Sequence, residues 1–421
     1  MRRLPDLSAK RESESEEPSP SPLGGQVLTA LNYDLFPDIE PRPRGALRTT
    51  GTFPSQMLEA LLEEGAISAS KPFAEKQIQP SSFDLRLGPV AYRVQASFLP
   101  VGRMKVEGKL QKLVMDEIDL TRAALFEKGC VYLVPLLEQL RLPRDVYGKA
   151  NPRSTTGRLD IFTRLITDYG MEFDRVIPGY TGKLYAEIVP RTFGVILQEG
   201  IRLNQLRLIR GRHRQGDPTL SRLNEEEPLV YNDEGLPEKP TIEGGLRLSI
   251  DLKGRRGADV VGYKAKKHAP AIDFKKVDYY DPLEFWDPVH ASRIANGLVL
   301  NPGDFYIFAS KERVSVPPHF AAELVPFDAA IGEFRIHYAG FFDPGFGYGG
   351  DTVKGAAAVL EVRSHDIPFL VDDGQMVGRL VFEPLIEKPD RIYGEKLGSS
   401  YQSQSLALSK QFRRGEAVMT G

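Results

Sequence analysis

Val131-Tyr132-Leu133-Val134 and Phe305-Tyr306-Ile307-Phe308 are two short apolar runs that lie 174 residues apart in the chain. Runs of this length, rich in branched and aromatic residues and bounded by turns, are typical of buried strands. Similar runs recur between Pro-Gly and Asn-Pro turns through most of the sequence. Short strands at intervals of about 8–12 residues predict an all-β barrel or sandwich.

The two runs belong to a longer internal repeat. Residues Gly129, Tyr132, Pro143, Pro152, Glu187 and Gly200 recur, displaced by 174, as Gly303, Tyr306, Pro317, Pro326, Glu361 and Gly374. Pro178-Gly179 returns as Pro344-Gly345, displaced by 166, so the first copy carries the longer loop. Phe83–Gly88 and Ile250–Gly254 form a weaker pair upstream. Six matches at one displacement are hard to obtain by chance, and they predict two β-rich domains of common ancestry.

Polar stretches mark the boundaries of these domains. Residues 1–25 contain Ser, Glu and Pro with almost nothing to bury, which predicts disorder. Residues 211–243 are expected to form an interdomain linker or a long surface insertion. One helix is expected at Ser55–Gly65, with Ser55 as its N-cap and Gly65 as its stop. The predicted division is a tail at 1–50, a first domain at 51–210, the linker, a second domain at 244–390 and a C-terminal segment at 391–421.

Composition excludes several classes of protein. The chain has 55 Lys+Arg and 57 Asp+Glu, a net charge of −2, which gives no basic field to hold a long nucleic acid. Cys130 is the single cysteine, so a disulfide within the chain and a cysteine-rich zinc site are excluded, as expected in a reducing cytosol. No apolar run reaches the roughly 18 residues of a membrane span, and no secretory signal follows Met1. We expect a soluble, cytoplasmic protein.

The familiar catalytic motifs of zinc and serine enzymes are missing from the sequence. The six histidines form neither H-E-x-x-H nor an H-x-E pattern with a downstream P-C-x-x-C. The sequence also has no G-x-S-x-G elbow and no G-x-x-x-x-G-K-[ST] phosphate loop. These absences argue against zinc nucleobase deaminases and metalloproteases.

Three segments contain candidate functional residues. Asn151–Leu159 combines hydroxyl groups with two arginines, which can donate charge-assisted hydrogen bonds to phosphate oxygens, although a solvated turn would look the same. Val176–Ile188 places Glu187 between apolar neighbours after a Pro-Gly turn. Burial there would raise the pKa of Glu187 toward the range of a general base, whereas a half-exposed strand glutamate is the simpler alternative. Gly200–Leu206 is a turn that enters another apolar strand.

Taken in order, these segments resemble the trimeric dUTPase and dCTP deaminase superfamily. The motifs are P-R-S-x-x-x-R-L at 152–159, P-G-Y-x-G at 178–182 followed by Glu187, and G-x-x-x-x-Q-L at 200–206. Residues 59–67, 78–88 and 142–148 are similar to the dCTP deaminases in particular, and Tyr393-Gly394 with 400–404 resembles the segment that closes over nucleotide. The resemblance is to the double-length, tandem-repeat bacterial enzymes. It implies two tandem dUTPase-like distorted β-barrels, jelly-roll-like, with a few short helices.

The resemblance also implies a reaction. Enzymes of this family convert dCTP to dUTP and ammonia without zinc, feeding dUMP and dTTP synthesis. A partly buried glutamate would take a proton from the water that attacks C4 of cytosine, and a serine and an arginine would balance the developing charge. The implied catalytic residues are Glu187 or Glu361 with Ser154 and Arg158, and the implied substrate-binding residues are Arg153, Thr155, Ala339, Asp343, Gln205, Tyr393, Tyr401 and Gln404. The implied cofactor is Mg²⁺ carried by the substrate phosphates, and the implied partners are dCTP and dUTP, dTTP as a feedback inhibitor, and further copies of the chain.

The two copies depart from the family pattern at different places. In the second copy Asp328 replaces Ser154 and, allowing one inserted residue, Glu333 replaces Arg158, so two acids would repel a triphosphate. In the first copy Ile177 replaces the aspartate that the second copy keeps as Asp343.

This complementary loss predicts one composite site, with Ser154 and Arg158 from the first copy and Ala339, Asp343 and Glu361 from the second. The rival hypothesis is that like copies pair and that Glu187 is the base. Two other functions stay open: dUTP pyrophosphate hydrolysis, alone or after deamination, and nucleotide-binding regulation without catalysis. The acidic substitutions favour the last, whereas the intact Ser154, Arg158 and both glutamates argue against it.

Overall fold

The computed structural model describes residues 48–102, 104–211, 216–326, 334–336, 340–349, 353–364, 366–393 and 406–414. Almost all of the predicted disordered tail, residues 1–50, lies outside them. All described residues belong to one compact unit, Gly45–Gly421. In the described part of the chain, no helix is long and apolar enough to cross a membrane.

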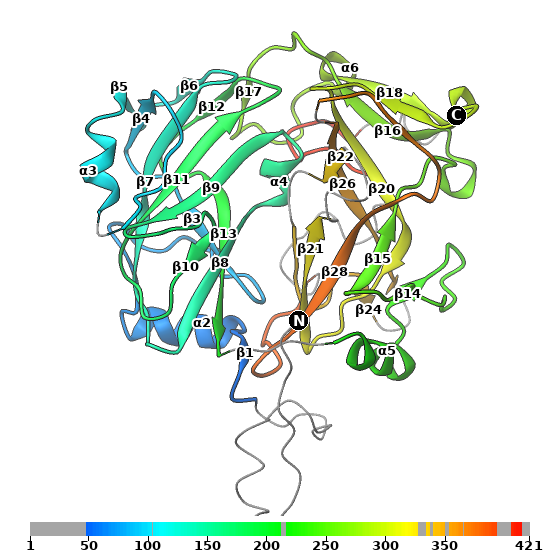
Figure 1. Ribbon diagram of the computed structural model, residues 1–421, viewed down its shortest axis with the longest axis horizontal. Helices are drawn as coiled ribbons and strands as arrows, with labels where there is room; N and C mark the ends of the chain where they lie inside the picture. Colours follow the sequence, from blue (N-terminus) through cyan, green and yellow to red (C-terminus); the bar gives the residue numbers. More distant parts are fainter. Residues whose placement is uncertain are drawn as a thin grey trace, which may run out of the picture. The chain divides into compact units, whose positions relative to one another are not determined.

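The first domain is built on two antiparallel sheets (Figure 1). One has the order β1-β13-β8-β10 with β3 also on β13, and the other has the order β5-β4-β7-β11-β9 with β2 also on β7. Its elements are β1 (Gly51–Thr52), α2 (Ser55–Glu63), β2 (Ile67–Ala69), β3 (Phe83–Arg86), β4 (Val90–Val94), α3 (Val106–Leu110), β5 (Val114–Asp119), β6 (Ala124–Phe126), β7 (Val131–Arg141), β8 (Val146–Pro152), α4 (Ser154–Gly157), β9 (Ile161–Thr167), β10 (Arg175–Val176), β11 (Thr181–Pro190), β12 (Val195–Leu197) and β13 (Arg202–Arg210).

The second domain repeats this plan, with sheets ordered β18-β16-β20-β26-β22 and β15-β28-β21-β23. Its elements are α5 (Asp217–Glu226), β14 (Val230–Tyr231), β15 (Leu246–Ser249), η1 (Arg255–Gly257), β16 (Val260–Ala265), β17 (Ile272–Asp273), α6 (Pro282–Phe285), β18 (Trp286–His290), η2 (Ala291–Arg293), β19 (Leu298–Leu300), β20 (Phe305–Val314), β21 (Phe320–Pro326), β22 (Phe334–Ile336), β23 (Phe341–Phe342), β24 (Tyr348–Gly349), β25 (Val353–Lys354), β26 (Ala356–Ser364), β27 (Phe369–Val371) and β28 (Met376–Pro384). The prediction of two mainly β domains with a few short helices is confirmed.

Strand pairing reproduces the sequence repeat. Glu187 on β11 lies opposite Leu133 on β7, and Glu361 on β26 lies opposite Ile307 on β20, so both partners move by the same 174 positions. Leu206 opposite Ala150 likewise corresponds to Leu380 opposite Leu324. The displacement read from six sequence matches is therefore the displacement of the hydrogen-bonded framework.

The weaker upstream pair is wrong. Phe83 lies opposite Leu206, and the residue opposite the equivalent Leu380 is Leu246. Phe83 therefore corresponds to Leu246 and not to Ile250, because the segments that join β3 to β4 and β15 to β16 differ in length. The incorrect alignment was suggested by the dipeptide Asp-Leu, which occurs as Asp84-Leu85 and as Asp251-Leu252. The second of these lies four residues beyond Arg247-Leu248, the true counterpart of Asp84-Leu85.

The predicted first helix forms at Ser55–Glu63, with one difference at its start. Pro54 occupies the N-cap position, and no side chain caps the helix, so Ser55 is its first residue and not its N-cap. Gly65 has φ 69° and its N–H donates to Leu62 O. This left-handed conformation suits glycine and ends the helix as predicted.

The polar stretch at 211–243 contains secondary structure of its own. Helix α5 and strand β14 lie within it, and β14 pairs with β20 of the second domain through Val230 opposite Val314. Leu220 and Leu229 are buried in the apolar cluster of the second domain. A few buried apolar residues therefore attach the stretch to the second domain, and its many charged residues made this hard to predict from composition.

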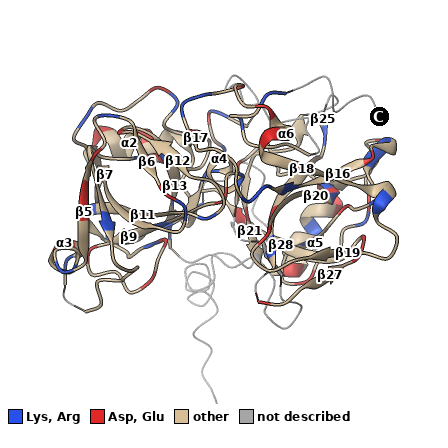
Figure 2. Ribbon diagram, turned by 90° about the horizontal axis from the view of Figure 1, so that it is seen from above, with Lys and Arg blue, Asp and Glu red and all other residues tan. Residues whose placement is uncertain are grey.

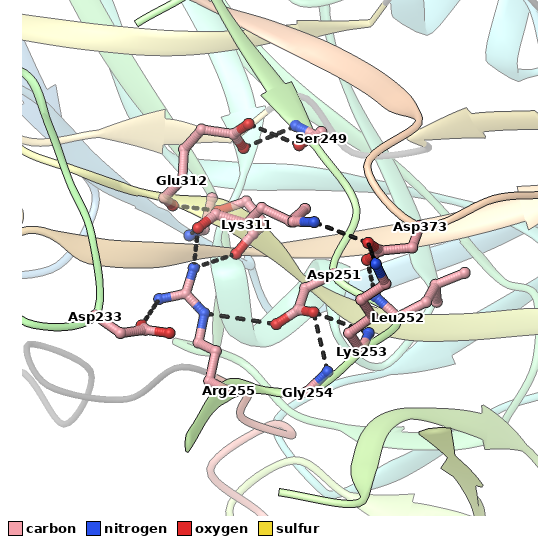
Figure 3. Close-up of polar contacts among 12 residues, drawn as sticks. Asp233, Ser249, Asp251, Leu252, Lys253, Gly254, Arg255, Lys311, Glu312 and Asp373 are labelled. Carbon is pink, nitrogen blue, oxygen red and sulfur yellow. Dashed lines mark hydrogen bonds and ion pairs between the residues drawn. The ribbon is translucent and has the colours of Figure 1, made fainter. Parts of the chain in front are cut away.

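A bulge in β20 is closed by a polar network in the second domain. The register shifts between Ala309 and Arg313, which frees carbonyl groups from the ladder. The Arg255 guanidinium donates to Ser310 O at 2.7 Å and to Lys311 O, and it pairs with Asp233 and Asp251 (Figure 3). The carbonyl groups of Ser310 and Lys311 thereby gain a hydrogen-bond partner outside the ladder.

The apolar core continues from one domain into the other. Trp286, fully buried, lies 5.4 Å from Phe193 of the first domain and 6.0 Å from Phe412 of the C-terminal segment, ring centroid to ring centroid. Strand β17 extends across the junction and pairs in parallel with β12 of the first domain. The two domains thus meet over a packed, mostly aromatic surface.

Candidate active site

The junction between the domains contains a set of buried or half-buried ion pairs. Arg207 on β13 is fully buried, donates to Glu383 at 3.0 Å, and lies with its guanidinium carbon 4.0 Å from the centre of the Phe341 ring. Lys149 on β8 donates to Glu323 at 3.0 Å and to Glu383 at 2.8 Å. In these contacts the first domain supplies the cations and the second the anions. Elsewhere acidic and basic positions are interspersed in both domains (Figure 2).

The Ser/Arg motif lies at this junction, on the short helix α4. Arg158 N donates to Ser154 O at 3.0 Å, which places the two side chains one turn apart on the same face. Thr156 Oγ1 anchors the turn by donating to Leu203 O at 2.9 Å. Ser154 is exposed and therefore accessible to a ligand, whereas Arg158 is only 6 % exposed.

Glu361 faces this turn from the second domain. It lies on β26, is 6 % exposed, and is close enough to Arg158 for the two charges to interact. Burial raises the pKa of Glu361 to about 7, and the positive charge of Arg158 opposes the rise. A carboxyl group with this pKa changes protonation state near neutral pH, as a general base must.

Glu187, the equivalent residue of the first domain, lies in a different environment. Its Oε1 accepts from Arg164 Nε at 3.0 Å and from Nη2 at 2.5 Å. The Arg164 guanidinium in turn lies between Phe162 and Phe173, with ring-centre distances of 4.8 and 3.4 Å. Glu187 is thus held as one half of an internal ion pair.

Beside the Ser/Arg turn, three cations gather around one carboxylate. Asp84 on β3 has no exposed surface and contacts Arg153 at 3.0 Å and Arg202 at 3.2 Å. Lys410 comes from the C-terminal segment, and burial together with Arg153 and Arg202 lowers its pKa, against the effect of Asp84. Arg153, Arg202 and Lys410 outnumber the two acids of the cluster, Asp84 and the neighbouring Asp343, and the surplus of positive charge suits phosphate oxygens.

The C-terminal segment, residues 406–414, carries Lys410 to this place. Ser409 Oγ donates to Thr155 O at 3.1 Å, beside the Ser/Arg motif, and Gln411 Nε2 donates to Phe274 O of the second domain at 2.9 Å. Phe412 packs 5.4 Å from Phe285. The segment therefore contacts both domains next to the positive cluster.

Asp343, at the Pro-Gly turn of the second domain, also lies at the junction. Its Oδ1 accepts from Ser81 at 2.9 Å and lies 3.9 Å from Arg207 Nη2. Burial raises the pKa of Asp343, and Arg207 and Arg153 oppose the rise. Its first-domain counterpart Ile177 is 49 % exposed and contributes no charge there.

The remaining predicted substrate-binding residues are placed as follows. Gln205 on β13 lies opposite Asp84 and Asn151. Tyr393 N donates to Pro344 O at 2.8 Å, next to the Asp343 turn, and its ring centre is 5.7 Å from that of Phe346. Ala339, Tyr401, Gln404, Asp328 and Glu333 lie outside the described residues.

The structure also brings in residues that the motifs did not single out. These are Ser81, Asp84, Asp160, Thr192, Arg202, Arg207, Arg363 and Lys410. Asp84 and Arg202 occur within recognised stretches, but their charge roles depend on the pairing of β3 with β13. Lys410 lies in the C-terminal tail and no sequence pattern marked it. Within the part of the chain that the structure describes, no three His, Cys, Asp or Glu side chains are grouped as a metal site.

Comparison with family models assigns both halves of the chain. Residues 49–212 match the 2′-deoxycytidine 5′-triphosphate deaminase (DCD) N-terminal domain, and residues 216–412 match the corresponding C-terminal domain. The chain is also similar to a solved structure, that of 2′-deoxycytidine 5′-triphosphate deaminase from Agrobacterium tumefaciens. The two sequences are 47% identical and the TM-score is 0.76, and the match covers 80% of this chain and 100% of the solved chain.

Curated relatives align with shorter parts of the chain. The dCTP deaminase, dUMP-forming, of Dictyoglomus thermophilum is 31% identical over 180 residues, which are 36% of this chain and 82% of the relative. The protein of the same name in Halobacterium salinarum is 34% identical over 118 residues, 27% of this chain. For that relative and two others, the matched part spans 56%, 58% and 52% of their length, about half.

Proposed function

We propose, since the chain belongs to the 2′-deoxycytidine 5′-triphosphate deaminase family, that it hydrolyses dCTP to dUTP and ammonia at one composite site between its two domains. The observation that carries the proposal is the position of Glu361. It is a buried carboxyl group of the second domain with a pKa raised to about 7, and it faces Arg158 of the first.

In the proposed reaction Glu361 removes a proton from a water molecule, and the resulting hydroxide attacks C4 of cytosine. The ring nitrogen gains a proton as the tetrahedral intermediate forms. The C4–N bond then breaks, the departing amine takes up a proton, and ammonia leaves as the C4 carbonyl forms. Arg158 and the exposed Ser154 stabilise the developing charge and orient the water. Since Glu361 must be ionised to act, Arg158 also keeps enough of it in that form.

Arg153, Arg202 and Lys410 are proposed to hold the triphosphate, with Asp84 fixing both arginines in place. Mg²⁺ would enter with the substrate and neutralise part of the phosphate charge. We assign no role to zinc, because the buried glutamate supplies the base. Thr155, Gln205, Asp343 and Tyr393 border this region and are proposed to contact the nucleotide.

Glu187 is a weaker candidate for the base. Its carboxylate is bound by two nitrogens of Arg164, and that arginine is fixed between two phenylalanines. To take a proton, Glu187 would have to give up this ion pair in a buried position, which costs free energy. The composite site is therefore favoured over a site between two first domains.

Product analysis tests the function directly. The purified protein is incubated with dCTP and Mg²⁺ in chelator-treated buffer, and nucleotides and ammonia are both quantified. We expect dUTP and an equal amount of ammonia. Binding of dCTP by the folded protein without ammonia release would contradict the proposal and favour a nucleotide-binding regulator.

A second candidate, deamination followed by phosphate hydrolysis, is motivated by the relatives described as dUMP-forming. It predicts dUMP and pyrophosphate in place of dUTP. The same incubation distinguishes the two candidates, because added dUTP would be consumed only by the bifunctional enzyme. A cytoplasmic location, assembly into a homo-oligomer and inhibition by dTTP belong to the proposal and need separate measurements.

A further inference from the structure

A second charged residue accompanies Glu361 on strand β26. Arg363 follows it by two positions, and because side chains alternate along a strand, both residues lie on the same side of the sheet. The Arg363 guanidinium crosses the junction, pairs with Asp160 of the first domain and donates to Thr192 Oγ1 at 2.9 Å. Arg363 and Asp160 are 7 % and 0 % exposed. This is an ion pair between domains, withdrawn from solvent.

Hydrogen bonds of its own backbone and side chain fix Asp160 next to the Ser/Arg turn. It follows Arg158 by two positions, and its N–H donates to Gly157 O at 2.9 Å. Its carboxylate accepts from Thr192 Oγ1 at 2.5 Å, and its carbonyl accepts from Arg191 N at 3.0 Å. Its φ of 53° is a left-handed conformation that costs free energy for a residue other than glycine, and these contacts hold it.

We propose that Asp160 and Arg363 are a pair of positioning residues that set the separation of Arg158 and Glu361 across the domain junction. Each lies two residues from one member of the proposed catalytic pair, so their contact connects the Ser/Arg turn of the first domain to strand β26 of the second. The inference rests on the proposed deamination at the composite site. Since misplacing a reacting group by about 1 Å can cost a factor of about 100 in rate, a fixed link at this point has a direct use.

The first domain has no equivalent of Arg363. The first-domain residue displaced by 174 from Arg363 is Val189, which lies opposite Phe162 in the β11–β9 ladder. An apolar residue there cannot bind the carboxylate of Asp160. Two first domains facing each other would therefore lack the link, whereas the pairing of first with second domain provides it.

Steady-state kinetics on four variants tests the inference: Asp160→Asn, Arg363→Met, the double variant and Arg363→Lys. We expect each charge-removing single variant to lower kcat at least tenfold while KM for dCTP changes less than about threefold, because the proposed site gives the pair no contact with the nucleotide. The double variant should fall no further than the slower single variant, since both act through one contact. Arg363→Lys retains the positive charge and should recover part of kcat.

Two controls separate positioning from folding. Trp286 is the single tryptophan and packs on Phe193, the neighbour of Thr192, so its fluorescence emission reports whether the domains stay docked. Lys149→Met removes two other ion pairs of the junction, those with Glu323 and Glu383, neither of which lies on β26, and it should leave kcat within about twofold of wild type.

Provided that the wild-type protein releases ammonia, three results would overturn the inference. They are unchanged kcat in the single variants, a double variant that returns to the wild-type kcat, and an equal loss in Lys149→Met. Where the Trp286 emission of a single variant shows that its domains no longer dock, the kcat of the double variant, which leaves no unpaired buried charge, is used to test the inference. Absence of ammonia release by wild type would instead contradict the proposed function.

Discussion

Lys149 Nζ lies 3.0 Å from Glu323 Oε2, and the two residues occupy equivalent positions of the two repeats, 174 residues apart. Equivalent positions that touch lie next to the axis that relates the two domains. Two first domains placed in this way would set Lys149 against Lys149, and two second domains would set Glu323 against Glu323. Because like charges at such a distance repel, the junction favours the pairing of first with second domain.

Reversing one of these charges should destabilise the junction. Lys149→Glu or Glu323→Lys alone is expected to lower the free energy of unfolding by about 1–3 kcal/mol, because a half-buried charge then faces its like. The double variant restores an opposite pair at positions 149 and 323 and should recover part of the loss, although Glu383, the second partner of position 149, then still faces a like charge. Urea unfolding followed by Trp286 fluorescence measures all three. Additive losses in the double variant would show that the contact carries no pairing energy.

The rate of deamination should depend on the ionisation of Glu361. Because the base must be ionised and burial raises its pKa to about 7, kcat is expected to rise with pH and to level off above about pH 7. Arg158 lowers this pKa, so Arg158→Met should move the midpoint to higher pH as well as reduce the rate. A midpoint near pH 4.5 in wild type, typical of an exposed glutamate, would contradict the assignment.

Stability should respond to pH in the opposite sense. Burial raises the pKa of both Glu361 and Asp174 to about 7, whereas in the unfolded chain they ionise near 4.5 and 3.8. Between about pH 4.5 and 7 the folded state keeps protons that the unfolded state releases. Their contribution is therefore complete below the unfolded pKa and is lost as pH rises through 7, by up to about 1.4 kcal/mol per pH unit for each group.

The variants Glu361→Gln and Asp174→Asn should each remove one group from this pH dependence. Urea unfolding at pH 5, 6, 7 and 8 measures the difference in stability between wild type and variant. That difference should move in favour of the variant as pH rises. A difference that stays constant over this range would show that the two carboxyl groups ionise equally in both states.

Loss of Arg255 should reduce stability without affecting the chemistry. Arg255→Met leaves the bulge carbonyls of Ser310 and Lys311 without their donor and should lower the free energy of unfolding by about 1–3 kcal/mol. None of the residues in this network belongs to the proposed site, so kcat should stay within about twofold of wild type. Thermal melting and the ammonia assay check the two parts. A large fall in kcat with unchanged melting would contradict this structural role.

The sequence predicted the fold through its anchors. Gly129, Tyr132 and Pro143 with their displaced counterparts mark turns and buried strand positions, where only a few residue types fit, and the 174-residue displacement returned in the strand registers. The alignment of Phe83 with Ile250 failed because a strand is not fixed by two shared letters when the loop after it changes length. The N-cap at Ser55 failed because Pro54 begins the helix.

The site was predictable only in part. The complementary loss of Ser154 and Asp343 counterparts predicts a composite site, and the structure brings Arg158 close to Glu361. The Asp160–Arg363 link could not be predicted, because it joins residues 203 positions apart by contact between domains. Lys410 was missed for the same reason, since a lysine in a polar tail carries no mark of the cluster that it joins.

Glu361, and not Glu187, is proposed as the base of a single composite site. The most direct measurement is ammonia release from dCTP by Glu361→Gln and Glu187→Gln, two isosteric variants at equivalent positions of the repeat. We predict that Glu361→Gln lowers kcat by a factor of about 100–10,000, the usual contribution of a general base. Glu187→Gln, which can still accept a hydrogen bond from Arg164, should keep kcat within about tenfold. Loss of turnover in Glu187→Gln with turnover intact in Glu361→Gln would contradict the composite site.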